Sequence, residues 1–203
     1  TAGAFSALAA AREGLKVAVV ERGSSLGGLA ASSGLTEMNA AGFCGKPLYR
    51  GIEREVFDHL VESGHAAYHF AVPMSSNKNI KIDRLRYDPE MLKLLLEQMA
   101  VEAGVTLFYQ TELLSARETE EGCHIRVKGF YQEMDLYGKY LIDATGNASL
   151  VESLGGETQA ADDQTRMIST LMFRITNVDL EALHSFIHSP QLGEVIALGR
   201  EKG

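Results

Sequence analysis

Hydrophobic and polar positions predict that the chain opens with a helix and a buried strand. Small, mostly apolar residues fill Ala2 to Glu13, and Gly14 follows them at the position where helices commonly end. Lys16 to Val20 is a short run rich in β-branched residues and has no alternation of apolar and polar positions. Such a run is typical of a strand that is buried on both faces in a parallel sheet.

A second helix is predicted from its capping signals. Asp88, Pro89 and Glu90 combine a capping side chain, a proline suited to the first turn and an acid that complements the helix dipole, so we expect a helix up to about Ala103. Glu53 to Ser63 is also predicted to be helical. The segment 24–51 is rich in glycine with little periodicity, and residues 71–85 are expected to be irregular or to hold one short strand.

Short apolar runs after Gly104 predict an antiparallel meander with a turn at Glu121-Gly122. Later, a short helix, a strand and a second helix are expected. Three or four strands are expected in the meander, near Thr106 to Tyr109, Leu113 to Glu118, His124 to Lys128 and Met134 to Ile142. The later elements are Ala148 to Leu154, Met167 to Ile175 and Leu180 to His188.

Composition and charge narrow the classes of partner. The chain has 203 residues, a formal net charge of −8 and no cluster of Lys and Arg, so nucleic acid is not an expected partner. It has no apolar run near the roughly 20 residues that cross a bilayer, so no membrane association is expected. Cys44 and Cys123 have no CxxC or Cys/His spacing and are predicted to be unpaired thiols of a reducing, cytoplasmic compartment. The first residue is Thr1 rather than Met, so the lack of a visible signal peptide says little.

The N-terminal residues are suited to a dinucleotide diphosphate. A helix N-terminus offers free N–H groups to a pyrophosphate, and a carboxylate after the next strand can accept both hydroxyls of the adenosine ribose. Small residues surround Gly3, and Glu21 follows 18 positions later, close to the usual spacing of about 20. We therefore expect the chain to begin inside a GxGxxG turn whose last glycine is Gly3. The alternative is an alanine-rich core helix followed by an ordinary strand. Glu21 would repel a 2′-phosphate, which leaves FAD or NAD.

Several further motifs resemble one family. Glu21-Arg22-Gly23 with Leu26-Gly27-Gly28-Leu29-Ala30, then Thr111-Glu112-Leu113, and then Leu141 to Gly146, which contains Ala144-Thr145-Gly146, resemble FAD-dependent oxidoreductases of the glutathione-reductase-like structural class. The resemblance implies FAD as cofactor. It places Gly27, Gly28 and Ala30 near the cofactor, the backbone of Leu113 against adenine, and the Ala144-Thr145-Gly146 turn beside the FAD.

The resemblance also implies the fold and the chemistry. The expected fold is α/β, an FAD/NAD(P)-binding Rossmann-like three-layer fold with a parallel sheet and an antiparallel meander. Residues 1–50 and 86–160 would form the FAD-binding domain, without its first strand. Residues 51–85 and 161–203 would form part of a substrate lobe, for which Leu171 to Arg174 resembles an opening strand. The expected activity is hydride transfer between a small-molecule substrate and flavin.

Two departures from the family pattern limit these expectations. Asn147 stands where the family commonly has an acid, although Asn can still cap a helix. No segment after Gly146 matches the family's late Gly-Asp motif, so we expect these 203 residues alone to bind FAD weakly or not at all and to be inactive. A flavoprotein that modifies transfer RNA, an NAD-binding module without flavin and a non-enzymatic scaffold remain as alternatives. The sequence leaves the catalytic residues and the oligomeric state open.

Three further groups of residues are expected to have no catalytic role. The pairs His65/His69 and His184/His188 lack a third ligand at useful spacing for a metal. Cys44 is expected to be a bystander near the flavin. Asp143 is predicted to accept hydrogen bonds from backbone N–H groups.

Overall fold

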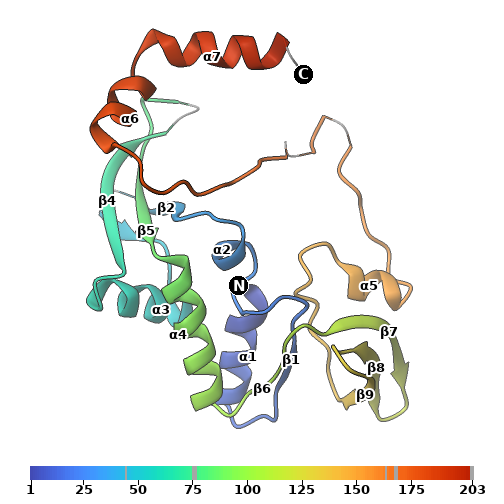
Figure 1. Cartoon of the computed structure of the whole chain (residues 1–203). Helices are drawn as coiled ribbons and strands as arrows, with labels where there is room; N and C mark the ends of the chain where they lie inside the picture. Colours follow the sequence, from blue (N-terminus) through green and yellow to red (C-terminus); the bar gives the residue numbers. More distant parts are fainter. Residues whose placement is uncertain (44, 75–76, 163, 167–168, 202–203) are drawn as a thin grey trace. The chain divides into compact units, whose positions relative to one another are not determined.

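The computed structural model describes residues 1–43, 45–74, 77–162, 164–166 and 169–201. Contacts divide the chain into two compact units, Thr1–Thr170 and Leu171–Gly203, and each unit is described by itself. The first unit is the mixed α/β structure expected from the sequence, with one parallel and two antiparallel sheets (Figure 1).

The chain opens with the predicted helix and strand. Helix α1 (Ala2–Arg12) is followed by Gly14, whose φ of +81° is a conformation that glycine adopts readily. Strand β1 (Ala18–Val20) is shorter than predicted and pairs in parallel with β6 (Thr106–Phe108). The sequence placed β6 in the meander, and this assignment was wrong. Strands β1 and β6 are far apart in the sequence, so no local sequence pattern indicates that they pair.

A four-stranded antiparallel sheet occupies segments for which the sequence predicted little regular structure. Its order is β3-β2-β5-β4. Strand β5 has buried side chains at Leu85 and Tyr87. The carboxylate of Glu37, in the neighbouring strand β2, accepts hydrogen bonds from Arg84 and Arg86 of β5. Register shifts interrupt the ladders, which explains the missing alternation. The strands are β2 (Glu37–Phe43), β3 (Lys46–Pro47), β4 (Ala66–Pro73) and β5 (Lys81–Tyr87), and the short helix α2 (Leu29–Ser32) precedes them.

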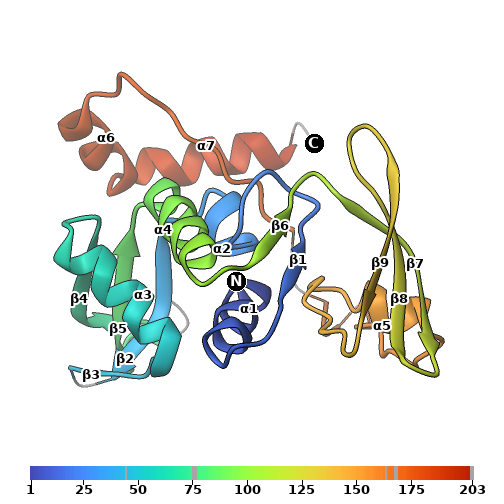
Figure 2. The ribbon, with the colours of Figure 1, turned by 90° about the horizontal axis from the view of Figure 1, so that it is seen from below.

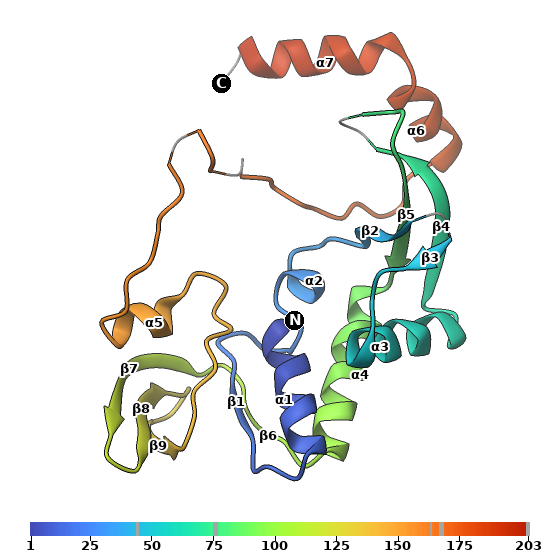
Figure 3. The same ribbon diagram turned by 180° about the vertical axis from the view of Figure 1, so that it is seen from behind.

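Three helices pack against one another and form the core of the first unit. Helix α3 (Gly51–Glu62) and helix α4 (Pro89–Glu102) lie beside α1, as Figures 1 and 3 show. Asp88 caps α4 as predicted, because its carboxylate accepts a hydrogen bond from the Glu90 amide at 2.9 Å. The side chains that these helices bury completely include Leu8, Phe57, Leu92 and Leu96.

The predicted meander is present as a three-stranded antiparallel sheet. Strands β7 (Glu112–Thr119), β8 (Gly122–Lys128) and β9 (Glu133–Gly138) lie side by side in that order (Figure 2). The turn between β7 and β8 lies at Glu120 and Glu121, and Gly122 begins β8, which agrees with the turn expected at Glu121-Gly122. Strand β9 ends earlier than predicted, and the chain reaches the short helix α5 (Ser149–Ser153) through irregular backbone.

The second unit contains α6 (Leu180–Ile187) and α7 (Pro190–Glu201). Asp179 caps α6 by accepting from the amides of Glu181 and Ala182, both at 3.0 Å. The strand predicted over Met167 to Ile175 is not found: residues 169–175 have no regular structure, and Met167 and Ile168 lie outside the described residues. A strand requires a ladder partner, and apolar composition does not supply one. Within the described chain, no helix combines the length and the apolarity that a membrane span requires.

Candidate functional site

Three separate segments meet at the start of α1. A Cβ atom added to Gly3 would lie 3.0 Å from the Cβ of Ala144, and one added to Gly28 would lie 3.1 Å from the backbone nitrogen of Thr1. The Thr1 hydroxyl also donates a hydrogen bond to the carbonyl of Gly27. The helix start, the Gly27-Gly28 turn and the turn after Asp143 are therefore in direct contact through small residues.

The Gly27-Gly28 turn has a backbone conformation that disfavours other residues. Gly27 has a φ of +110° and Gly28 a φ of +55°. A Cβ at Gly27 would lie only 2.5 Å from the Cβ of Ala31, so a side chain does not fit there. Ala30 lies in α2, directly after the turn, and its carbonyl accepts a hydrogen bond from the Tyr87 hydroxyl of β5 at 2.8 Å. The turn is thus held from both the helical and the sheet side.

Glu21 lies directly after β1, close to the start of α1. Its amide donates to the Phe108 carbonyl at 2.9 Å and its carbonyl accepts from the Thr111 amide at 3.0 Å, so the backbone pairing of β1 with β6 continues through it. Its carboxylate accepts from the Gly23 amide at 2.6 Å. The negative charge of Glu21 acts on the backbone nitrogen of Thr1. The acid is therefore near enough to α1 to act electrostatically on the helix start.

The loops after β1 and β6 are tied together. The Gln110 amide donates to the Gly23 carbonyl at 2.9 Å, and the buried Thr111 hydroxyl donates to the Tyr109 carbonyl at 2.8 Å. Leu113 follows in β7, at the edge of the three-stranded sheet, where it pairs with Val127. Arg22 is exposed beside Glu21.

The turn from Asp143 to Gly146 is built around one carboxylate. Asp143 accepts hydrogen bonds from the Thr145 amide at 2.8 Å, the Thr145 hydroxyl at 2.7 Å and the Val151 amide at 3.0 Å. Desolvation raises the pKa of Asp143, but these hydrogen bonds outweigh it and the net shift is downward. The structural role predicted for Asp143 is confirmed.

The predicted capping role of Asn147 was wrong. The N-cap of α5 is Ala148, which has a φ of +60° and no side-chain cap bond. The Thr145 hydroxyl accepts from the Ser149 amide at 3.0 Å instead, while the Asn147 amide oxygen accepts only from the Ser149 hydroxyl at 2.6 Å. Because Asp143 and Thr145 already bind the free amides of α5, Asn147 is not needed as a cap.

The structure thus brings some predicted residues together and leaves others apart. Gly3, Gly27, Gly28 and Ala144 form direct contacts at the helix start, and Glu21 lies near them. Thr145 and Gly146 are exposed on the turn beyond Ala144, Arg22 is exposed, and Leu113 reaches this region only through the loop at Thr111.

Sequence reasoning missed Tyr109 near this site. Burial raises the pKa of Tyr109, as do its hydrogen bond to Glu97 at 2.9 Å and the nearby charge of Glu21. The only signal in the sequence was an aromatic residue directly after the apolar run of β6.

The remaining residues singled out in the sequence add no metal site. His65 directly precedes β4 and His69 lies within it, so they do not share a helix face. His184 and His188 stack with ring centroids 4.3 Å apart, but the described part of the chain holds no group of three potential metal ligands. Cys123 is a free, buried thiol, and Cys44 lies outside the described residues.

The geometry fits a dinucleotide diphosphate better than an ordinary core helix. No side chain among the described residues caps α1, so its first amides are available to an anion. Gly3 and Gly28 approach Ala144 and the backbone of Thr1 at that end, and a side chain at either glycine would intrude on the contact. Glu21 adds a carboxylate at the end of the neighbouring strand, where a ribose diol can be bound.

Comparison with known proteins agrees with this reading of the geometry. A family model described as FAD dependent oxidoreductase matches residues 1–200. No curated protein matches the chain. Among solved structures, the chain is similar to CabE, an aromatic hydroxylase from angucycline biosynthesis, with 17% identity over 76% of this chain and 31% of that one and a TM-score of 0.53. It is also similar to a flavoprotein/dehydrogenase from Cytophaga hutchinsonii, with 13% identity over 80% of this chain and 42% of that one and a TM-score of 0.52.

These structural similarities concern the fold. A third structure, AlpK, is 18% identical over 76% of this chain and 32% of its own, with a TM-score of 0.50. The chain spans 31% to 56% of the length of three further solved structures that it matches.

Proposed function

The chain belongs to the FAD dependent oxidoreductase family, whose cofactor is FAD, and from this premise we propose that it forms the FAD-binding part of an enzyme that transfers a hydride between a small-molecule substrate and flavin. The observation that carries the proposal is the contact of Gly3, Gly28 and Ala144 at the start of α1, with Glu21 beside it. We also propose that the protein is cytoplasmic and that neither nucleic acid nor a membrane is its partner.

In this proposal each segment holds a different part of FAD. The amides at the start of α1 bind the pyrophosphate, and Gly3 lets the turn at Ala144 approach that end closely. Glu21 binds the adenosine ribose, with Arg22 exposed at the same loop. Gly27, Gly28 and Ala30 let the backbone approach the cofactor, and the backbone of Leu113 faces adenine. The cofactor passes the turn formed by Ala144, Thr145 and Gly146.

The rigidity of these segments supports the same proposal. The Glu21 carboxylate is already oriented by the Gly23 amide, and the loop around it is tied to Gln110 and Thr111. Asp143 fixes the turn that carries Ala144 and Thr145. A site ordered before its ligand arrives loses less conformational entropy on binding. The flavin supplies the redox chemistry, and the protein binds and orients it.

The role of Glu21 can be tested by FAD affinity. In the protein purified as its gene encodes it, Glu21→Gln should weaken FAD binding by roughly 10- to 100-fold, because it removes a charged acceptor worth about 1.5–3 kcal/mol. Fluorescence quenching during a titration with FAD measures the affinity. Glu13→Gln, at the exposed far end of α1, is the matched control and should leave the affinity unchanged.

Two results would contradict the proposal. One is a Glu21→Gln protein that binds FAD as tightly as the unaltered protein. The other is a purified protein that takes up no flavin. The 203-residue chain alone is predicted to bind FAD weakly or not at all and to be inactive, and the same titration of that chain with FAD tests its binding.

A further inference from the structure

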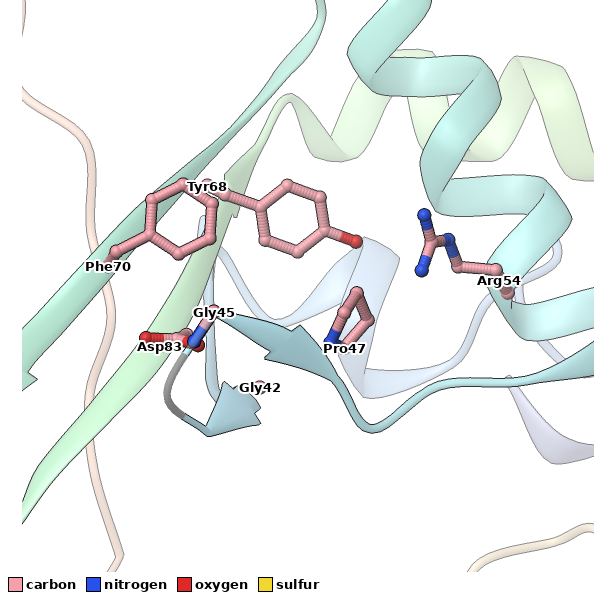
Figure 4. Close-up of a pocket in the computed structure, with 7 residues that line it drawn as sticks. All are labelled: Gly42, Gly45, Pro47, Arg54, Tyr68, Phe70 and Asp83. Carbon is pink, nitrogen blue, oxygen red and sulfur yellow. The ribbon is translucent and has the colours of Figure 1, made fainter.

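A cavity of about 270 Å³ lies in the four-stranded sheet, outside the proposed FAD site (Figure 4). It is bounded by α3 and by strands β2, β3, β4 and β5. No residue proposed to bind FAD lines it. The described residues that line it are Gly42, Gly45, Pro47, Arg54, Tyr68, Phe70 and Asp83.

Two hydrogen-bond donors in this cavity are without a full set of partners. The Tyr68 hydroxyl oxygen is buried and has no hydrogen-bond partner among the described residues. Arg54, whose side chain is 42% exposed, donates through Nε to Asp58 and has no protein partner for its two terminal nitrogens in the described chain, so these nitrogens are open to a ligand or to solvent. Figure 4 shows the guanidinium of Arg54 and the hydroxyl of Tyr68 pointing toward one another across the cavity. A buried hydroxyl without a partner is costly, and a ligand atom between the two groups would relieve that cost.

The other side chains in the cavity do not compete for the same ligand atom. Asp83 is 2% exposed, and its two oxygens already accept from the amides of Gly45 at 2.7 Å and Ala71 at 2.9 Å. Its carboxylate therefore fixes the surrounding backbone. The ring of Phe70 stacks on that of Tyr68, with centroids 5.9 Å apart and an angle of 17° between planes. Together with Pro47, the rings make an apolar wall.

The charges of the cavity indicate the class of ligand. Burial raises the pKa of Tyr68, so its hydroxyl stays protonated at neutral pH and can donate. The hydrogen bond to Asp58 raises the pKa of Arg54, which stays charged. A guanidinium edge beside a hydroxyl donor matches the planar oxygens of a carboxylate. Asp58 and Asp83 place two negative charges near the one positive charge of Arg54, so a monoanion is repelled less than a doubly charged phosphate, and the guanidinium disfavours a cation.

We infer that this cavity binds a small organic acid, whose carboxylate is held by the guanidinium of Arg54 and the hydroxyl of Tyr68 and whose apolar body packs against Phe70. The inference does not depend on flavin binding, because its residues are separate from the proposed cofactor site. It therefore stands or falls independently of the proposed function.

Benzoate is a suitable probe, because it combines a planar carboxylate with one apolar ring. In a titration of the purified protein followed by ligand-observed NMR, benzoate should bind saturably with a Kd on the order of 1 mM, as expected for a ligand of this size. Arg54→Gln and Tyr68→Phe should each weaken binding by roughly 5- to 20-fold. Tyr68→Phe removes one oxygen atom from a site where it has no partner, so the fold should be retained. Thermal unfolding of each variant checks this.

Two controls test whether binding depends on the carboxylate of the ligand and whether it occurs in this cavity. Arg126→Gln alters an exposed arginine in the other antiparallel sheet and should leave benzoate binding unchanged. Benzyl alcohol, which lacks the carboxylate, should not bind measurably. Absence of saturable benzoate binding would overturn the inference. It would also be overturned if the folded Tyr68→Phe and Arg54→Gln proteins bound benzoate as tightly as the unaltered protein. Displacement of benzoate by an equal concentration of inorganic phosphate would also overturn it, because the cavity would then prefer another class of anion.

Discussion

At the scale of single residues, Asp143 shows how one carboxylate orders a turn. It accepts from two backbone amides, of Thr145 and Val151, and from the Thr145 hydroxyl, so it ties the turn after the meander to α5. These bonds require an acceptor on both carboxylate oxygens. An amide in the same place can accept on only one side.

The replacement Asp143→Asn should lower the free energy of unfolding by about 1 kcal/mol at neutral pH. Because the hydrogen bonds lower the pKa of Asp143, its stabilisation is present above the ordinary pKa of an aspartate, about 3.9, and is lost as the pH falls through the lower pKa of the folded state. Urea unfolding at neutral and strongly acidic pH should therefore show a difference that shrinks in acid. Glu118→Gln, on the exposed face of β7, is the control. A difference of equal size at both pH values would contradict this account.

At the scale of elements, α4 depends on its first turn. Asp88 accepts from the Glu90 amide, and the same helix buries Leu92 and Leu96 completely in the core. Asp88→Ala should cost about 1 kcal/mol, while Asp88→Asn, which keeps a side-chain acceptor, should cost much less. Urea midpoints at equal slope would measure both. Equal losses in the two variants would show that the charge, rather than the cap, is what stabilises the helix.

The elements that the sequence predicts well are those with local signals. The sequence predicts the bounds of α1, α3, α4, α6 and the meander to within a few residues. Caps, glycine stops and tight turns mark these bounds because they lie next to the ends of the elements. The four-stranded sheet was not, because its strands are held by distant partners such as Glu37 with Arg84 and Arg86. Register shifts in β2 and β4 also remove the alternation that marks a strand.

The candidate sites also contain some residues that a local sequence pattern predicts and others that it does not. Spacing along the chain predicted Gly3 and Glu21, because the motif joins adjacent elements. The contact of Gly3 with Ala144 depends on the chain returning after the meander, which no local pattern encodes. The cavity of Arg54 and Tyr68 had no sequence signal at all, because each residue comes from a different element and each is ordinary by itself.

At the scale of the whole molecule, burial is concentrated in the first unit. The core joins α1, α3 and α4 with β5, whereas the described residues of α6 and α7 include no buried side chain. Backbone hydrogen bonds without apolar cover open easily. In the 203-residue chain, amide hydrogen exchange should therefore be much faster in α6 and α7 than around Leu92 and Leu96. Mass spectrometry of peptides from the two regions measures this, and equal protection would contradict it.

The parallel pairing of β1 with β6 has a consequence for how such proteins diverge. The intervening chain, residues 21–105, includes the whole four-stranded sheet and its cavity. The entropy of closing such a loop rises only with the logarithm of its length, and doubling it costs about 0.6 kcal/mol. The connecting loops of the four-stranded sheet can therefore change in length at little expense to the two strands that frame it, whereas the same stretch also holds Glu21, the Gly27-Gly28 turn and the core helices α3 and α4, which such changes must leave in place. New specificity can arise there while the older nucleotide-binding scaffold is inherited unchanged.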